Sequence, residues 1–146
     1  MRLLHTSDWH LGKRLFDKER YDVFEKFLAW LLSTIRQERV DTLIVAGDIF
    51  DTAVPTNKSL RLYYDFSSYR TSIDCRHVVI VSGNHDSPTL LEAPKGILEN
   101  FGVHVIGGAE SPEDEVIELK DKAGNLEGVV CAVPFLRERD ILRLKD

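Results

Sequence analysis

The chain has little cysteine and no long hydrophobic run. Its 146 residues include two cysteines, Cys75 and Cys131, which lie far apart and outside any CxxC pattern. This pattern does not favour a disulfide framework, and both thiols are expected to be free. Apolar runs of only a few residues exclude a membrane-spanning helix. The beginning, MRLLHTSDWH, reaches polar residues too early for a signal peptide, so we expect a cytoplasmic location.

An excess of positive charge is also absent. The formal net charge is −5, whereas a passive nucleic-acid-binding module is usually basic. An enzyme whose acidic residues hold divalent cations remains compatible with this charge, because bound ions reverse the local sign. The length and the ordinary share of hydrophobic residues favour one globular domain.

Apolar runs typical of buried strands alternate with apolar residues at helical spacing. The α/β pattern predicts a mainly parallel sheet with flanking helices, followed by a C-terminal β-hairpin that begins a second sheet. The expected strands cover residues 2–6, 42–46, 77–81 and 103–106; the expected helices cover residues 20–36, 57–72 (with Asn57 as N-cap) and 90–101; the hairpin lies within residues 116–133.

The predicted helix over residues 57–72 has two apolar stripes. Leu60, Tyr63 and Tyr64 form the first; Leu62, Phe66, Tyr69 and Ile73, just beyond the helix, form the second. One stripe can cover the sheet. The second then packs on a neighbouring helix of the same chain or forms a dimer contact, because exposed apolar patches mark interfaces.

Three polar clusters each follow a predicted buried strand. They are Asp8-Trp9-His10, the segment GDIFD at residues 47–51 and the segment GNHD at residues 83–86. The carboxyl ends of strands meet at one rim of an open α/β sheet, which is where ligands bind. We therefore expect these three loops to form one site.

The residue types in these loops suit divalent metal ions. Carboxylate oxygens, an imidazole and an amide carbonyl match Mn²⁺, Fe²⁺ or Zn²⁺ better than a soft thiolate site would. We expect Asp8 and His10 at one ion, Asn84 at a second, and Asp48 between the two. Two ions about 3.5–4 Å apart supply the chemistry for in-line hydrolysis of a phosphate ester.

His85 is the candidate proton donor. If Asn84 faces the ions, its neighbour His85 points elsewhere and can donate a proton to the leaving oxygen. The Asp51 carboxylate is expected to orient the imidazole and fix its tautomer.

Basic residues near the rim are candidate DNA contacts. Lys13, Arg14 and Lys18 follow the first cluster, and Asn57 and Lys58 flank the second rim loop. Such side chains can contact phosphates, although a solvated surface without a ligand explains them equally well.

The segments DWH, GDIFD and GNHD resemble the D-x-H, G-D-x-x-D and G-N-H-D/E motifs of calcineurin-like metallophosphoesterases. The longer segments HTSDWHLGK, IVAGDIFDTAVP, VVIVSGNHDSP and VPFLRERD resemble the SbcD-type nucleases of SbcC–SbcD DNA repair complexes. The resemblance covers nearly all the chain. It implies an αββα sandwich that is incomplete in these residues.

The resemblance also implies a function. SbcD-type nucleases use Mn²⁺, with Mg²⁺, Fe²⁺ or Zn²⁺ as alternatives, and work with an SbcC-type ATPase. They act as 3′-to-5′ double-strand DNA exonucleases and as single-strand or hairpin endonucleases. By motif match, Asp8, His10 and Asp48 would hold one ion, Asp48 and Asn84 the other, and His85 would be catalytic. A homodimer through the first-half helices is also implied.

Further histidines that complete the family's metal site are absent from the sequence. We therefore expect residues 1–146 to be the N-terminal part of a nuclease domain, with weak metal binding and little or no activity alone. Two alternatives remain: a metallophosphoesterase that acts on other phosphoesters, and a non-catalytic dimerisation or scaffold module.

Overall fold

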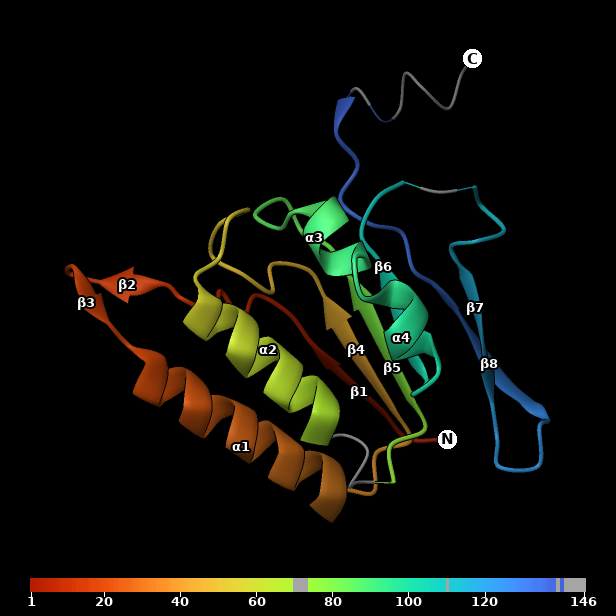
Figure 1. The fold of residues 1–146 in the computed structure, drawn as a ribbon. Helices are drawn as coiled ribbons and strands as arrows, with labels where there is room; N and C mark the ends of the chain where they lie inside the picture. Colours follow the sequence, from red (N-terminus) through yellow and green to blue (C-terminus); the bar gives the residue numbers. More distant parts are fainter. Residues whose placement is uncertain (70–73, 110, 139, 141–146) are drawn as a thin grey trace.

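The computed structural model describes residues 1–69, 74–109, 111–138 and 140. Its centre is a parallel sheet whose strand order is β1 (Leu3–Thr6), β4 (Thr42–Ala46), β5 (His77–Val81) and β6 (Val103–Ile106) (Figure 1). Each strand pairs with the next one in the sheet in parallel register. The loops that follow β1, β4 and β5 are therefore neighbours at one edge of the sheet.

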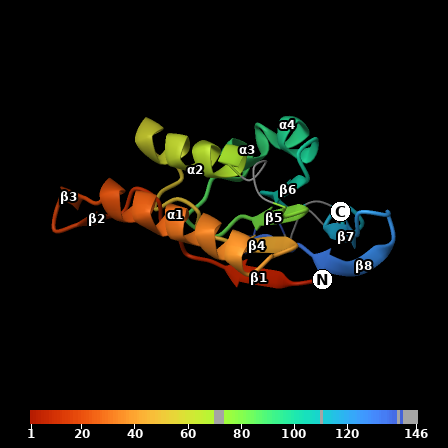
Figure 2. The same ribbon diagram turned by 90° about the horizontal axis from the view of Figure 1, so that it is seen from below.

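Helices cover one face of this sheet (Figure 2). They are α1 (Tyr21–Gln37), α2 (Asn57–Tyr69), α3 (Pro88–Glu92) and α4 (Lys95–Glu99). The helices contribute Leu31, Tyr63, Leu91 and Leu98 to the same buried cluster as the strand residue Val45. Burial of these side chains fixes the sheet, and hence the positions of its edge loops.

A hairpin of β7 (Val116–Lys120) and β8 (Leu126–Cys131) packs on the opposite face. Alternate side chains of β5 lie on opposite faces of the parallel sheet. Ile80 packs in the core under the helices, while Val79 and Val81 pack with Ile117 of the hairpin. On β1, Leu3 is exposed, so the second face is only partly covered. The α/β class and the incomplete second sheet are both confirmed.

Three local features of the structure differ from what the sequence analysis predicted or were absent from it. Residues 14–19 form a small hairpin of β2 (Arg14–Leu15) and β3 (Lys18–Glu19), too short to show strand alternation in the sequence. The prediction of a single helix over residues 90–101 is wrong. The structure has two short helices, α3 and α4, because Pro94 between them has no amide hydrogen with which to continue a helix.

The N-cap of α2 is the third difference. The cap is Thr56 rather than Asn57, because the Ser59 amide donates to the Thr56 hydroxyl oxygen at 3.2 Å.

The second stripe of α2 is not an exposed surface as a whole. Phe66 is buried against Trp9, with ring centroids 5.1 Å apart, so its place in a dimer contact is not supported. Leu62 lines a groove between α1 and α2. The Tyr69 side chain and Ile73 lie outside the described residues.

The two cysteines are thiols rather than halves of a disulfide, and Cys75 lies in the interior while Cys131 lies at the surface. Among the described residues, no helix combines the length and the apolar character needed to cross a membrane.

Candidate metal centre

The loop after β1 and the loop after β4 run side by side. The Asp8 amide donates to the Gly47 carbonyl at 3.1 Å, and the His10 amide donates to the Asp48 carbonyl at 2.9 Å. Leu11 then forms a parallel bridge with Phe50. Parallel pairing thus continues past the strands and holds the first two predicted clusters together.

Three of the candidate ligands have left-handed backbone. The φ angles are +55° at Asp8, +46° at His10 and +51° at Asp48. Left-handed backbone at a residue that has a Cβ costs about 1–2 kcal/mol of conformational free energy. Strain of this kind is concentrated at functional sites. Trp9, between the first two, is buried and donates its indole N–H to the Thr6 hydroxyl at 3.1 Å.

Asp8, His10 and Asp48 converge. His10 Nε2 lies 3.7 Å from Asp8 Oδ1 and 3.8 Å from Asp48 Oδ2, too far for hydrogen bonds. One ligand atom from each residue lies within 4.8 Å of the others. Nitrogen and carboxylate oxygens at this spacing can share one divalent ion.

The second nitrogen of His10 supports the same interpretation. His10 Nδ1 is buried without a hydrogen-bond partner and lies 3.3 Å from Asp51 Oδ1. A histidine that binds a metal commonly turns its other nitrogen toward a carboxylate in this way. Asp51 can therefore orient His10, and the residues present fit a divalent metal ion.

Asn84 lies at the same cavity. Asn84, Asp8 and Asp48 line a cavity of about 440 Å³, whose lining also includes Val130 in β8 and Phe135 after it. Asn84 is exposed, so its amide oxygen is accessible to a second ion. Three of the four predicted ligands therefore border one cavity, and the fourth, His10, belongs to the same cluster as Asp8 and Asp48.

The Asp51 carboxylate does not orient His85, contrary to the prediction. His85 Nδ1 instead donates to the Asp51 main-chain carbonyl at 2.8 Å, which requires the proton on Nδ1. Nε2 is then the nitrogen left for a substrate. The two imidazoles of His10 and His85 lie edge to face, with centroids 5.0 Å apart.

Asp86 is the site residue to which the sequence assigned no role. Its fully buried carboxylate accepts the amides of Phe50 at 2.9 Å, Gly83 at 2.9 Å and Ile49 at 3.2 Å. Burial raises the pKa of Asp86, and these three hydrogen bonds oppose the rise. Asp86 thus fastens the loop after β5 to the loop after β4.

Gly83 gives a local test of this packing. A Cβ at Gly83 would collide with the amide nitrogen and Oδ1 of Asp48. We expect Gly83→Ala to lower the free energy of unfolding by about 1–3 kcal/mol, because the Asp48 backbone must shift. Gly96→Ala is the matched control: nothing lies within 4 Å of its Cβ, and alanine favours its helix. Equal melting temperatures for the two variants would contradict this expectation.

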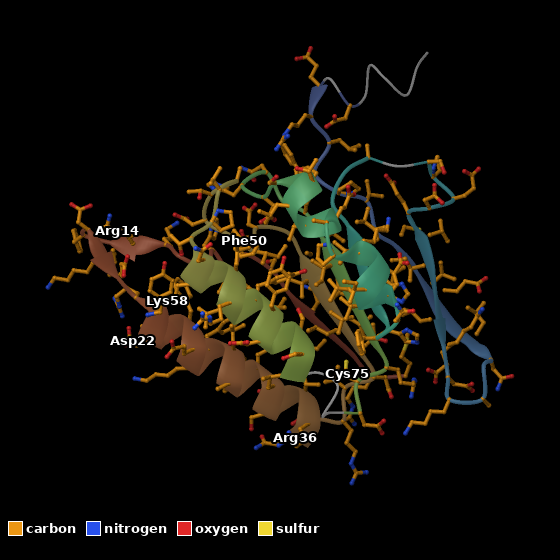
Figure 3. The ribbon with its side chains drawn as sticks, viewed as in Figure 1. Arg14, Asp22, Arg36, Phe50, Lys58 and Cys75 are labelled. Carbon is orange, nitrogen blue, oxygen red and sulfur yellow. The ribbon has the colours of Figure 1, made fainter. Side chains whose placement is uncertain are left out.

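The predicted DNA contacts fall into two groups. Lys13 Nζ lies 3.7 Å from Asp51 Oδ1 at the metal cluster, and Arg14 and Lys18 are exposed on the β2–β3 hairpin. Asn57 and Lys58 line the groove between α1 and α2 instead. Lys58 Nζ lies 4.3 Å from the centre of the Tyr21 ring; Figure 3 shows Lys58 near the start of α2.

The fold and the cluster define the class of protein. A family model described as calcineurin-like phosphoesterase matches residues 1–138, so the chain belongs to the calcineurin-like phosphoesterase family. Members of this family use divalent metal ions, in agreement with the ligand cluster.

Comparison with individual proteins shows a more specific similarity. The chain is 40% identical to the SbcD component of the SbcCD nuclease of Rhodobacter capsulatus over 99% of its length, covering 38% of that protein. It is 39% identical to the SbcD component of the Escherichia coli K12 nuclease over 97% of its length, covering 34% of that protein. The chain thus spans about a third of the length of the curated relatives it matches.

A solved structure confirms the fold. The crystal structure of Pseudomonas putida nuclease MPE superposes with a TM-score of 0.51 and 23% identity, covering 72% of this chain and 47% of that one. At this identity the likeness concerns the fold alone.

Proposed function

We propose that this chain is the N-terminal part of the nuclease domain of an SbcD-type DNA nuclease, located in the cytoplasm. Its expected reactions are 3′-to-5′ exonuclease cleavage of duplex DNA and endonuclease cleavage of single strands or hairpins. An SbcC-type ATPase and a second copy of the chain are its proposed partners. Two linked observations carry the proposal. Asp8, His10 and Asp48 form one cluster, with the His85 ring against that of His10. Asp8 and Asp48 also line one cavity with Asn84.

Each site residue has a proposed part in phosphodiester hydrolysis. Asp8, His10 and Asp48 would hold one Mn²⁺ ion, and Asp48 and Asn84 a second. When bound, the two ions polarise the phosphate and supply a nucleophile at neutral pH. His85, held through Nδ1 by the Asp51 carbonyl, would present Nε2 to the leaving oxygen.

Metal-dependent cleavage tests this proposal. End-labelled duplex and hairpin DNA would be incubated with Mn²⁺ and either residues 1–146 or the full-length gene product. We expect cleavage by the gene product and little by residues 1–146, because the latter supply only three protein ligands to one ion and two to the other.

Asp48→Asn is the decisive variant. Loss of one carboxylate oxygen at the bridging position should lower Mn²⁺ affinity at least 10- to 100-fold, since even residues that only support metal ligands have effects of that size. The matched control is Asp74→Asn, which removes an exposed carboxylate paired with Lys122 at 2.8 Å. Binding would be measured by calorimetry and cleavage on gels.

Three outcomes would redirect the proposal. Cleavage that survives Asp48→Asn would place the chemistry elsewhere. Hydrolysis of small phosphodiesters without cleavage of DNA would favour a phosphoesterase with other substrates. A stable dimer of the gene product without any metal-dependent hydrolysis would favour a scaffold role.

A further inference from the structure

The tip of the β2–β3 hairpin has an unusual residue at a strained position. Arg14 pairs with Glu19 and Leu15 with Lys18, so Phe16 and Asp17 form a two-residue turn. Both have left-handed backbone, with φ of +47° and +59°. Turns of this type favour asparagine and glycine, and a bulky residue with positive φ is an outlier.

Burial does not compensate for this strain. Phe16 is 91% exposed, more than any other large apolar side chain in the described part of the chain, and its neighbour Leu15 is 51% exposed. The hairpin projects beyond the start of α1 in both ribbon views (Figures 1 and 2). The fold therefore gains little packing energy from this phenyl ring, whose face is open to a ligand.

The charge around the ring is positive in an otherwise acidic chain. Residues 13–20 contain Lys13, Arg14, Lys18 and Arg20 against only two acidic residues, while the whole chain has a net charge of −5. The Arg14 guanidinium donates to the Asp17 carbonyl at 2.6 Å, which holds a cation close below the tip. Figure 3 shows Arg14 on the hairpin at the edge of the molecule.

The hairpin begins at the metal centre. The Lys13 amide donates to the His10 carbonyl at 2.9 Å, and Phe16 follows Lys13 closely in the chain. Three extended residues span about 10 Å, or about three nucleotides at roughly 3.4 Å each along one DNA strand. A strand whose phosphate lies at the metal centre can therefore reach the ring with a base.

We propose that Phe16 stacks on an unpaired base of the DNA strand held at the metal centre, with the hairpin cations at its phosphates. An exposed aromatic ring beside cations is the combination by which proteins bind single-stranded nucleic acid. This inference rests on the proposed function, since it takes DNA as the substrate. Such stacking would make the protein bind frayed or single-stranded ends more tightly than paired duplex.

The test compares four residues at position 16 in the full-length gene product. Binding of a fluorescent single-stranded oligonucleotide would be measured by anisotropy in EDTA, so that no cleavage occurs. Stacking of one base on an aromatic ring predicts a loss of affinity of about 5- to 150-fold in Phe16→Ala. Phe16→Trp should bind at least as tightly as the original protein.

Phe16→Leu separates stacking from simple hydrophobic contact. Leucine is apolar but has no ring face. The Phe16→Leu variant should therefore bind the oligonucleotide as weakly as Phe16→Ala if a base stacks on the ring, and as tightly as the original protein if the contact with DNA is only hydrophobic. Val54→Ala is the control for a second highly exposed apolar residue, at 86%, and should leave affinity unchanged. Sedimentation of each variant shows whether the ring instead contacts a second copy of the chain.

The outcomes also separate this inference from the proposed function. Unchanged affinity in Phe16→Ala, or full affinity in Phe16→Leu, would overturn the stacking contact even if DNA is cleaved. Phe16-dependent binding without Mn²⁺-dependent cleavage would support the contact and count against the nuclease. Hydrolysis of a small phosphodiester should be unaffected by Phe16→Ala.

Discussion

His85→Asn should lower kcat for DNA cleavage by about 10²- to 10⁴-fold, the usual contribution of a positioned general acid. The asparagine side chain retains an N–H near the position of His85 Nδ1, so the hydrogen bond to the Asp51 carbonyl, 2.8 Å in the structure, can persist. Asparagine has no counterpart of Nε2, the atom that is proposed to donate a proton to the leaving oxygen. Mn²⁺ affinity should stay within a few-fold of the original.

The leaving group provides the sharpest measurement. A deoxyribose oxygen needs a proton as it departs, whereas p-nitrophenolate leaves without one. If His85 is a proton donor, His85→Asn should lose far more activity on DNA than on bis-p-nitrophenyl phosphate. Equal losses on both substrates would show that His85 acts only by binding the phosphate or by holding its loop.

Asp51→Asn is the matched control for His85. It keeps the main-chain carbonyl that holds His85 and removes the carboxylate that lies 3.3 Å from His10 Nδ1. We expect Mn²⁺ affinity to fall by about 10- to 100-fold, with kcat retained at saturating metal. His85→Asn should therefore lower kcat and keep Mn²⁺ affinity, whereas Asp51→Asn should lower Mn²⁺ affinity and keep kcat. A large loss of kcat in Asp51→Asn at saturating Mn²⁺ would restore the idea that the carboxylate orients His85.

The meeting of the three loops was predictable because it depends on coarse features. Short apolar runs mark parallel strands, and Asp8, Asp48 and Asn84 all follow such runs. Strands that are neighbours in a parallel sheet bring their carboxyl ends together. The prediction therefore needed only the order of strands, and the structure finds these residues at one cavity. Their roles as ligands stay predictions.

The directions of individual groups were not predictable. The left-handed turns at Asp8, His10 and Asp48 decide which way each side chain points. A sequence gives little sign of a positive φ at a residue that is not glycine. The same limit explains why the Asp51 carbonyl was overlooked. Pro94, by contrast, was a visible signal of a helix break that apolar spacing had obscured.

Asp86→Ala should lower the free energy of unfolding by at least about 3 kcal/mol. It leaves the amides of Ile49, Phe50 and Gly83 without their carboxylate acceptor, and each unsatisfied buried donor costs about 1–3 kcal/mol. Asp86→Asn should have a smaller effect, because it keeps one carbonyl oxygen and nearly the same volume. Thermal unfolding of both variants beside the original protein gives the comparison.

Hydrogen exchange locates the effect of Asp86. In Asp86→Ala, amide protection should fall first at Ile49, Phe50 and Gly83, while Val79 inside β5 stays protected, because its hydrogen bonds belong to the sheet. Mn²⁺ affinity should fall together with that protection, since Asp48 and Asn84 lie in the two loops that Asp86 fastens. A variant that loses stability but keeps full Mn²⁺ affinity would mean that the other contacts between the loops, led by the Asp48 bond to the His85 amide at 3.0 Å, hold the ligands in place by themselves.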